Sequence, residues 1–139
     1  MKAVKGLIRL HRWQLDEKRR NLADLERMKE EFERQVERLE AEIAAEQKVA
    51  SDVEARFAYG AYAQTAVRRR ATLQRSIADL NSQILAAREE VAAAFQEVKK
   101  YELLQEQRDR RIREWTARRE QSIQDEVAIQ GYRRRQGGD

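Results

Sequence analysis

Apolar residues in the first 57 residues of the chain recur at alternating intervals of three and four. If Leu22 is position a of a heptad, twelve of the 16 a and d positions are apolar. These positions are Val4, Ile8, His11, Leu15, Lys18, Leu22, Leu25, Lys29, Phe32, Val36, Leu39, Ile43, Glu46, Ala50, Val53 and Phe57. A sustained 3.5-residue period is typical of helices that pack in coiled coils. The pattern therefore predicts a first helix over about residues 4–50 or beyond.

The second half of the chain has its own heptad register. Its a and d positions are Leu73, Ile77, Leu80, Ile84, Ala87, Val91, Ala94, Val98, Tyr101, Gln105, Arg108, Ile112 and Trp115. They are apolar as far as Tyr101, and beyond it several apolar residues leave the register, namely Leu103, Leu104, Ile123 and Val127. Such drift indicates a change of partner or looser packing. The pattern predicts a second helix over about residues 61–130.

Each apolar stripe is too narrow to be stable unless another stripe covers it, and the nearest partner is the other half of the same chain. Two turn signals lie between the registers. Ser51 and Glu54 have the spacing of a capping box, and Gly60 can adopt the left-handed conformation that ends a helix. We therefore place the tip of a chain reversal at about residues 51–62.

The predicted fold is all-α, a single antiparallel two-helix coiled-coil hairpin over residues 1–139. In this hairpin Leu22 and Leu25 face residues 85–98, and the basic tail at 131–139 is frayed. A dimer of extended helices is the structural alternative.

Composition supports long helices. The chain has 139 residues, of which 39% are charged, with five glycines and no proline, so few chain reversals are expected. It has no cysteine, which excludes disulfides and fits a reducing compartment. The N-terminal residues resemble no signal peptide, and no segment approaches the ~18 apolar residues of a membrane span. We expect a soluble intracellular protein.

Charge is distributed unevenly. Residues 1–20 carry seven Lys and Arg against two acidic residues, and residues 108–139 carry nine against six. The middle, residues 21–107, carries 13 against 17. A hairpin would bring the two basic ends of the chain together, opposite the tip.

The sequence offers no catalytic chemistry. The chain has one histidine, His11, and therefore no histidine pair at metal-ligand spacing. No phosphate-binding glycine loop or nucleophile motif is present. We predict no enzyme activity, no cofactor and no metal. The arginine-rich stretch 108–120 is interrupted by acidic residues, so nucleic acid is not an expected partner.

Three aromatic residues crowd around Gly60: Phe57, Tyr59 and Tyr62. They either plug the open end of the coiled coil or form an exposed contact, for which tyrosine is well suited. Phe57 continues the first register, so we expect it to close the coiled coil. Tyr62 lies off the second register, and we expect it to contact a partner together with Tyr59.

Three segments carry a resemblance to a known family. They are LIRLHRWQLDEKRRNLADLE at 7–26, FAYGAYAQTAVRRRATLQRSIADL at 57–80, and VKKYELL-x-E-x-RDRR at 98–111. In these segments and in its layout the chain resembles the flagellar export protein family FliJ, most closely its alphaproteobacterial form.

The resemblance implies a non-enzymatic stalk of the flagellar type III export apparatus, similar to the central stalk of rotary ATPases. One end would bind the hexameric export ATPase and the other would face the membrane export gate, at the cytoplasmic side of the inner membrane. Association with export chaperones is also implied. The alternatives are a generic coiled-coil tether or holdase chaperone and, less favoured, a nucleic-acid-binding coiled coil.

The candidate contact residues lie at the two ends. Phe57, Tyr59 and Tyr62 are the candidates for the gate, with Leu73 and Ile77 as alternatives that also belong to the register. The candidates for the ATPase are Arg9, Arg12, Arg110, Arg111, Arg113 and Trp115.

Overall fold

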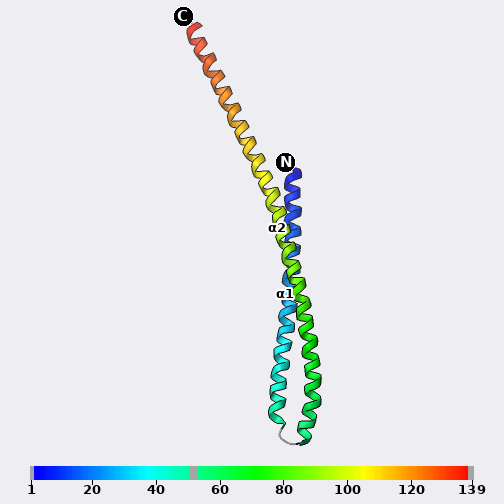
Figure 1. Ribbon diagram of the computed structural model, residues 1–139. Helices are drawn as coiled ribbons and strands as arrows, with labels where there is room; N and C mark the ends of the chain where they lie inside the picture. The colour runs from blue at the N-terminus through cyan, green and yellow to red at the C-terminus, as the bar shows by residue number, and fades with distance from the viewer. Residues whose placement is uncertain (1, 51–52, 138–139) are drawn as a thin grey trace. The chain divides into compact units, whose positions relative to one another are not determined.

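The computed structural model describes residues 2–50 and 53–137. It contains helix α1, Lys2–Val49, and helix α2, Val53–Gly137 (Figure 1). Apart from Ala50, every described residue is helical. The predicted all-α helical hairpin is therefore confirmed.

Contacts divide the chain into two units, and both helices contribute to each. Unit 1 comprises Met1–His11 and Gln96–Asp139, and unit 2 comprises Arg12–Phe95. In unit 2, three ion pairs join α1 to α2, and the residue number falls in α2 as it rises in α1, so the helices are antiparallel. The pairs are Lys18 with Glu90, Glu26 with Arg88, and Glu40 with Arg70, at 3.1, 3.7 and 3.1 Å. The first two lie on either side of Leu22 and Leu25 and place them opposite the predicted stretch 85–98.

The buried core follows the two heptad registers. In unit 2 the buried side chains are Leu15, Leu39, Ala66, Leu73, Leu80, Ile84 and Ala87. In unit 1 they are Ile8 and Val98. Among the described residues no side chain is less than 2% exposed, so the core is a single thin layer between two helices. Each buried leucine still contributes about 1.5–3 kcal/mol through loss of apolar surface to water.

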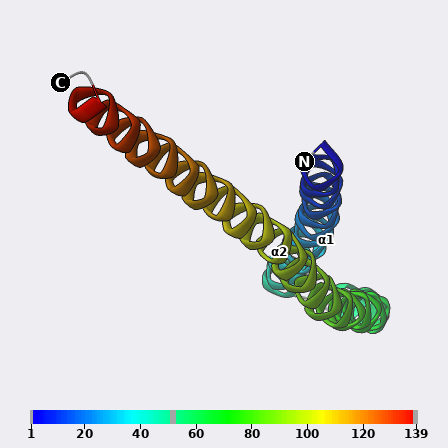
Figure 2. The ribbon, with the colours of Figure 1, turned by 90° about the horizontal axis from the view of Figure 1, so that it is seen from above.

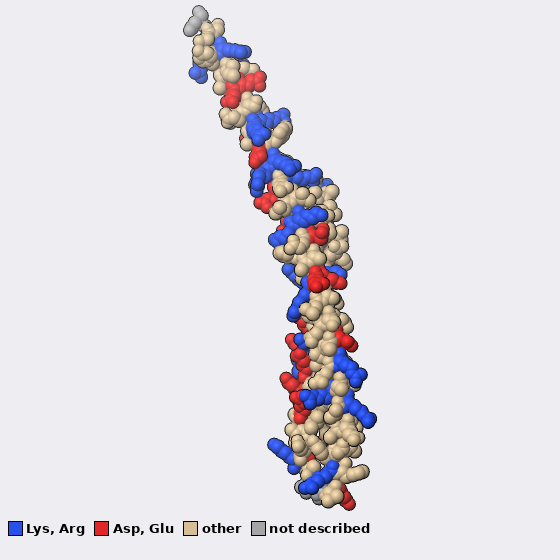
Figure 3. All heavy atoms as spheres, viewed as in Figure 1, with Lys and Arg blue, Asp and Glu red and all other residues tan. Residues whose placement is uncertain are grey.

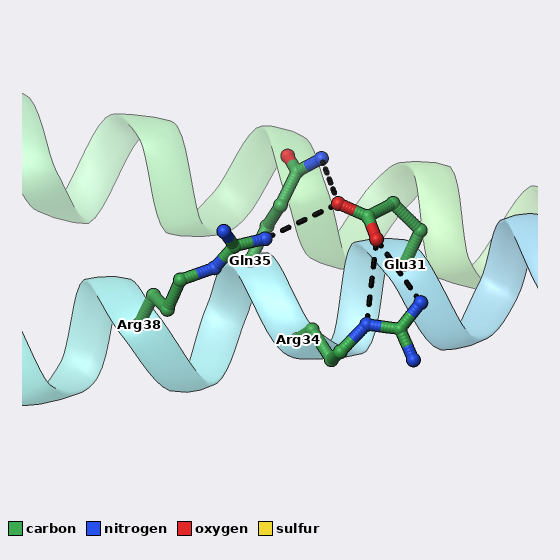
Figure 4. Close-up of polar contacts among 4 residues, drawn as sticks. All are labelled: Glu31, Arg34, Gln35 and Arg38. Atoms are coloured by element: carbon green, nitrogen blue, oxygen red, sulfur yellow. Dashed lines mark hydrogen bonds and ion pairs between the residues drawn. The ribbon is translucent and has the colours of Figure 1, made fainter.

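The outer faces of the helices are charged, with Lys and Arg interspersed among Asp and Glu (Figure 3). One cluster on α1 shows how these charges support the helix. Glu31 accepts hydrogen bonds from Arg34 at 3.0 and 3.3 Å, from Gln35 at 3.5 Å and from Arg38 at 3.2 Å (Figure 4). These bonds, first those from Arg34, lower the pKa of the Glu31 carboxyl. Side-chain pairs three and four residues apart stabilise a helix that has little core of its own.

The predicted tip needs correction at Gly60. This residue lies inside α2, and no described glycine has a positive φ. A glycine within a helix costs only about 1 kcal/mol relative to alanine, which is too little to end a long helix that is packed along its length. The chain instead reverses between Val49 and Val53. Ser51 of the predicted capping box lies outside the described residues.

The C-terminal tail also differs from the expectation. Residues 131–137 are helical rather than frayed, because α2 continues to Gly137. Arg134 and Arg135 lie in its last turn, where positive charge interacts favourably with the helix dipole.

Candidate functional site

The described interior of the molecule is apolar. Within residues 2–50 and 53–137 no polar or charged side chain is buried, and no acidic or histidine cluster has the makings of a metal site. In unit 1, His11 stacks on Tyr101, with ring centroids 4.7 Å apart and an interplanar angle of 17°. Both belong to the heptad registers, so the histidine has a packing role. The candidates are therefore surfaces.

The first surface lies in unit 2, where the chain reverses. Val49, Val53 and Phe57, which we call the tip surface, are all exposed, Val53 by 81% and Phe57 by 84%. Val53 and Phe57 are four residues apart on α2 and share one face of the helix. Apolar side chains that remain exposed together at one place are typical of a contact surface.

The prediction that Phe57 closes the coiled coil is wrong. It rested on extending the first register through Phe57, but α1 ends at Val49. Phe57 belongs to α2, whose own register extends back from Leu73 through Ala66 and Ala63 to Tyr59. The heptad register therefore begins anew in α2, and Phe57 lies outside the face of α2 that packs against α1.

Tyr62 lies off the heptad register, as predicted, but the expectation that it is therefore exposed is wrong. Its ring packs against the buried cluster of Leu39, Ala66 and Leu73, and its hydroxyl donates a hydrogen bond to Glu42 Oε2 at 3.5 Å. Burial, followed by the nearby Glu42 and Glu46 carboxylates, raises the pKa of Tyr62. Residues 66 and 73 follow residue 62 by four and eleven positions, which is about one and three turns at 3.6 residues per turn, so the three residues lie on one face. The strict 3.5 period misses this alignment.

The remaining tip candidates contribute mainly to packing. Tyr59 is half-buried. Leu73 belongs to the buried core and Ile77 is half-buried. Of the three predicted aromatic residues, Phe57 alone is largely exposed.

The second surface is a groove in unit 1 that has two adjoining parts, with volumes of about 380 and 330 Å³. The larger part is lined by Gln96, Lys99, Lys100, Leu103, Leu104 and Gln107. The part that involves both helices is lined by Val4, Leu7, Tyr101, Leu104, Gln107, Arg108 and Arg111. It therefore combines an apolar floor with two arginines. Arg111 was predicted, whereas Val4, Leu7, Leu104 and Arg108 were not. The departure of Leu104 from the heptad register was a signal for that residue alone.

The other predicted residues of the basic end are all exposed. Arg9, Arg110 and Arg113 belong to unit 1, whereas Arg12 belongs to unit 2. Arg110 forms an ion pair with Glu106 on the same helix at 3.6 Å. Trp115 is 60% exposed, and the Arg119 guanidinium lies over its ring, 5.3 Å from the centroid.

Helix α2 continues past the groove, and we call its residues 111–137 the α2 arm; Arg111, the first of them, also lines the groove. The arm is one continuous helix (Figures 1 and 2). Every residue from 111 to 130 is exposed. The arm nevertheless carries large apolar side chains, namely Ile112, Trp115, Ile123, Val127, Ile129 and Tyr132. Within the described part of the chain, no helix has the length and apolar character needed to cross a membrane.

Comparison with known proteins assigns the chain to a family. The family model described as Flagellar FliJ protein matches the chain over residues 1–137. No curated protein and no solved structure matches it. The matched range includes both helices, the tip surface, the groove and the α2 arm.

Proposed function

The chain belongs to the flagellar FliJ family and is a component of the flagellar export apparatus, and from this premise we propose that it works there as a non-enzymatic stalk. In this proposal the groove and the α2 arm bind the hexameric export ATPase. The tip surface contacts the membrane export gate. Export chaperones are further partners, and the stalk is held at the cytoplasmic face of the inner membrane by its partners.

The α2 arm is the observation that carries the proposal. Trp115, Ile123 and Val127 are each more than half exposed, although α2 remains helical around them. An isolated helix is only marginally stable in water, and most helical stability in proteins comes from packing of an apolar face. An arm of this kind therefore favours a partner that covers it.

The charge of this region indicates what the partner offers. Arg108 and Arg111 line the groove, Arg110 lies between them in the sequence, and Arg113 lies in the first turn of the α2 arm. A partner with acidic side chains around an apolar contact would complement both features, and charge complementarity raises the association rate and the specificity. We infer an acidic, partly apolar binding site on the ATPase.

The tip surface supports the second contact. Phe57 and Val53 have little packing role in unit 2, because more than four-fifths of each residue is exposed. Large exposed apolar residues that pack poorly within their own fold are suited to anchor a partner. We therefore propose Phe57, with Val49 and Val53, as the gate contact in place of Tyr62.

An ATPase assay tests the stalk proposal. The purified export ATPase is assayed with wild-type protein and with a variant that combines Arg9→Glu, Arg110→Glu, Arg111→Glu and Arg113→Glu. We expect the wild type to stimulate ATP hydrolysis and the variant to lose stimulation while keeping its helical circular dichroism, because surface charges contribute little to stability.

The matched control carries four arginine-to-glutamate changes on exposed positions of unit 2, at Arg19, Arg20, Arg27 and Arg75. It has the same net charge and should still stimulate the ATPase. If both variants lost stimulation equally, the loss would be due to net charge and not to the basic end. A wild-type protein that binds export chaperones without any effect on the ATPase would instead indicate a tether or a holdase.

A further inference from the structure

The α2 arm has a pattern of charge that the stalk proposal does not use. Arg118 and Arg119 lie four and three residues before Ser122, and Asp125 and Glu126 lie three and four residues after it. In an antiparallel pair of such segments, the basic residues of one copy would therefore face the acidic residues of the other. Among the described residues, none of these four charged side chains takes part in an ion pair; Asp125 accepts a hydrogen bond from Gln121 at 3.1 Å, and Arg119 lies over Trp115.

Helix geometry places these charges in two strips. Arg118 and Asp125 are seven residues apart and lie on one side of Ser122, about 40–60° around the helix. Arg119 and Glu126 lie at similar angles on the other side. Within one copy, the residues of each strip are separated by about 10 Å along the helix. Each strip therefore presents a positive and a negative charge to a neighbouring helix.

The face between the strips is narrow and partly apolar. Trp115, Ser122 and Ile129 follow one another at intervals of seven residues along its centre. Trp115 is 60% and Ile129 is 53% exposed. The small Ser122 at the midpoint allows two helices to approach closely.

We propose that two copies of this chain associate through their α2 arms, antiparallel, around a two-fold axis near Ser122. Such an axis runs between the helices and keeps each strip on its own side of the interface. It therefore brings Arg118 opposite Asp125 of the second copy, and Arg119 opposite Glu126 of the second copy. The symmetry repeats both pairs.

The same arrangement places Trp115 of each copy against Ile129 of the other. Arg111 and Arg133 lie near the same face and would meet as like charges. Their repulsion limits the contact to residues 112–132, about 30 Å of helix. This limit fixes the register, because a shift in either direction would separate the four ion pairs.

Self-association goes beyond the stalk function and occupies the surface proposed for the ATPase. The dimer is the form of the free protein, and the ATPase must displace the second copy to bind the arm. The two proposals fail separately, since one is measured on the protein alone and the other by ATP hydrolysis.

Charge exchange tests the pairing on the full-length chain. One variant carries Arg118→Glu and Arg119→Glu, and another carries Asp125→Arg and Glu126→Arg. Each creates four like-charge contacts in its own dimer, so sedimentation velocity should show a dissociation constant raised about tenfold or more relative to wild type. In an equimolar mixture all four contacts become opposite-charge pairs, and the dimer should return. A single chain with all four changes should also dimerise, to within about threefold of wild type.

The matched control for the first variant is Arg134→Glu with Arg135→Glu, which changes the net charge by the same amount on residues outside 112–132 and should not weaken the dimer. Circular dichroism confirms that each variant remains helical. A wild-type protein that stays monomeric at low salt up to about 200 μM, where charge attraction is least screened, overturns the proposal. So do weakened variants that fail to associate when mixed, because their charges would then not be partners.

Discussion

Two stretches of α2 share one heptad register and have different fates. From Leu73 to Tyr101 every a and d position is buried or half-buried, whereas Arg108, Ile112 and Trp115 in the same register are exposed. The period of a sequence therefore indicates where a helix can pack, and the presence of a facing helix decides whether it does. In the arm the register also becomes polar, at Arg119, Ser122 and Glu126. An interface built on such a face depends on charge as much as on apolar burial.

The largest expected effect is on stability, when a side chain is truncated in the packed stretch of α2 but not when one is truncated in the arm. Leu80→Ala removes a side chain that is 4% exposed, and we expect it to lower the free energy of unfolding by about 2–5 kcal/mol. The matched change in the arm, Ile123→Ala, should alter it by no more than about 0.5 kcal/mol. Chemical denaturation followed by circular dichroism measures both. Equal losses would mean that the arm is packed in the free monomer.

A second contrast lies at the tip. Tyr62→Ala should lower the free energy of unfolding by about 1–3 kcal/mol, since the ring packs on the Leu39 cluster. Phe57→Ala should change it by less than about 0.5 kcal/mol but weaken binding to the export gate. Thermal unfolding and a binding assay with the purified gate domain give the two readings. A Phe57→Ala protein that melts at a lower temperature and binds the gate normally would indicate that Phe57 packs in the coiled coil after all.

Alkaline pH should weaken the contribution of Tyr62 to the stability of the fold. The pKa of Tyr62 is raised, so its protonated hydroxyl stabilises the fold below the ordinary pKa of about 10, and this contribution is lost as the pH rises through the raised value. The free energy of unfolding should therefore fall above about pH 10. In Tyr62→Phe this part of the pH dependence should be absent, and an unchanged alkaline slope would show that the pKa of Tyr62 is not raised in the folded protein.

The smallest expected effect concerns the outer face of α1. The pKa of Glu31 is lowered, so its ionised form stabilises the fold above the ordinary pKa of about 4.5, and this contribution is lost as the pH falls through the lowered value. Glu31→Gln should be slightly less stable than wild type near neutral pH and equal to it in acid. Denaturation at pH 7 and at successively lower pH tests this, and a gap that does not close as the pH falls would contradict it.

Periodicity predicted most of the fold because a two-helix hairpin has one repeating contact. The buried residues from Ile8 to Val98 lie in the two registers or their direct extension at Ala66. The tip was harder to predict because α1 and α2 have independent phases on either side of the reversal. Because the register changes between the helices, Phe57 is exposed. Because a straight helix has 3.6 residues per turn, Tyr62 lies on the same face as Ala66 and Leu73 and packs there.

The surfaces were predicted less completely than the core. Basic composition pointed to the end that contains Arg111, but the groove depends on Val4 and Leu7 of α1 meeting Leu104 of α2. Such a contact between distant segments is set by the final packing of the helices. No local pattern in the sequence specifies it.

The antiparallel register has a consequence for the order of folding. Across unit 2, the Tyr62–Glu42 contact joins residues 20 apart in sequence, and the Lys18–Glu90 contact joins residues 72 apart. Closing the longer loop from an unfolded chain costs about 1 kcal/mol more in entropy than closing the shorter one. Once the contacts near the reversal have formed, each later contact closes only a small additional loop. Folding should therefore begin beside the reversal, at Leu39, Ala66 and Leu73, and zip along the two helices toward Leu15 and Lys18.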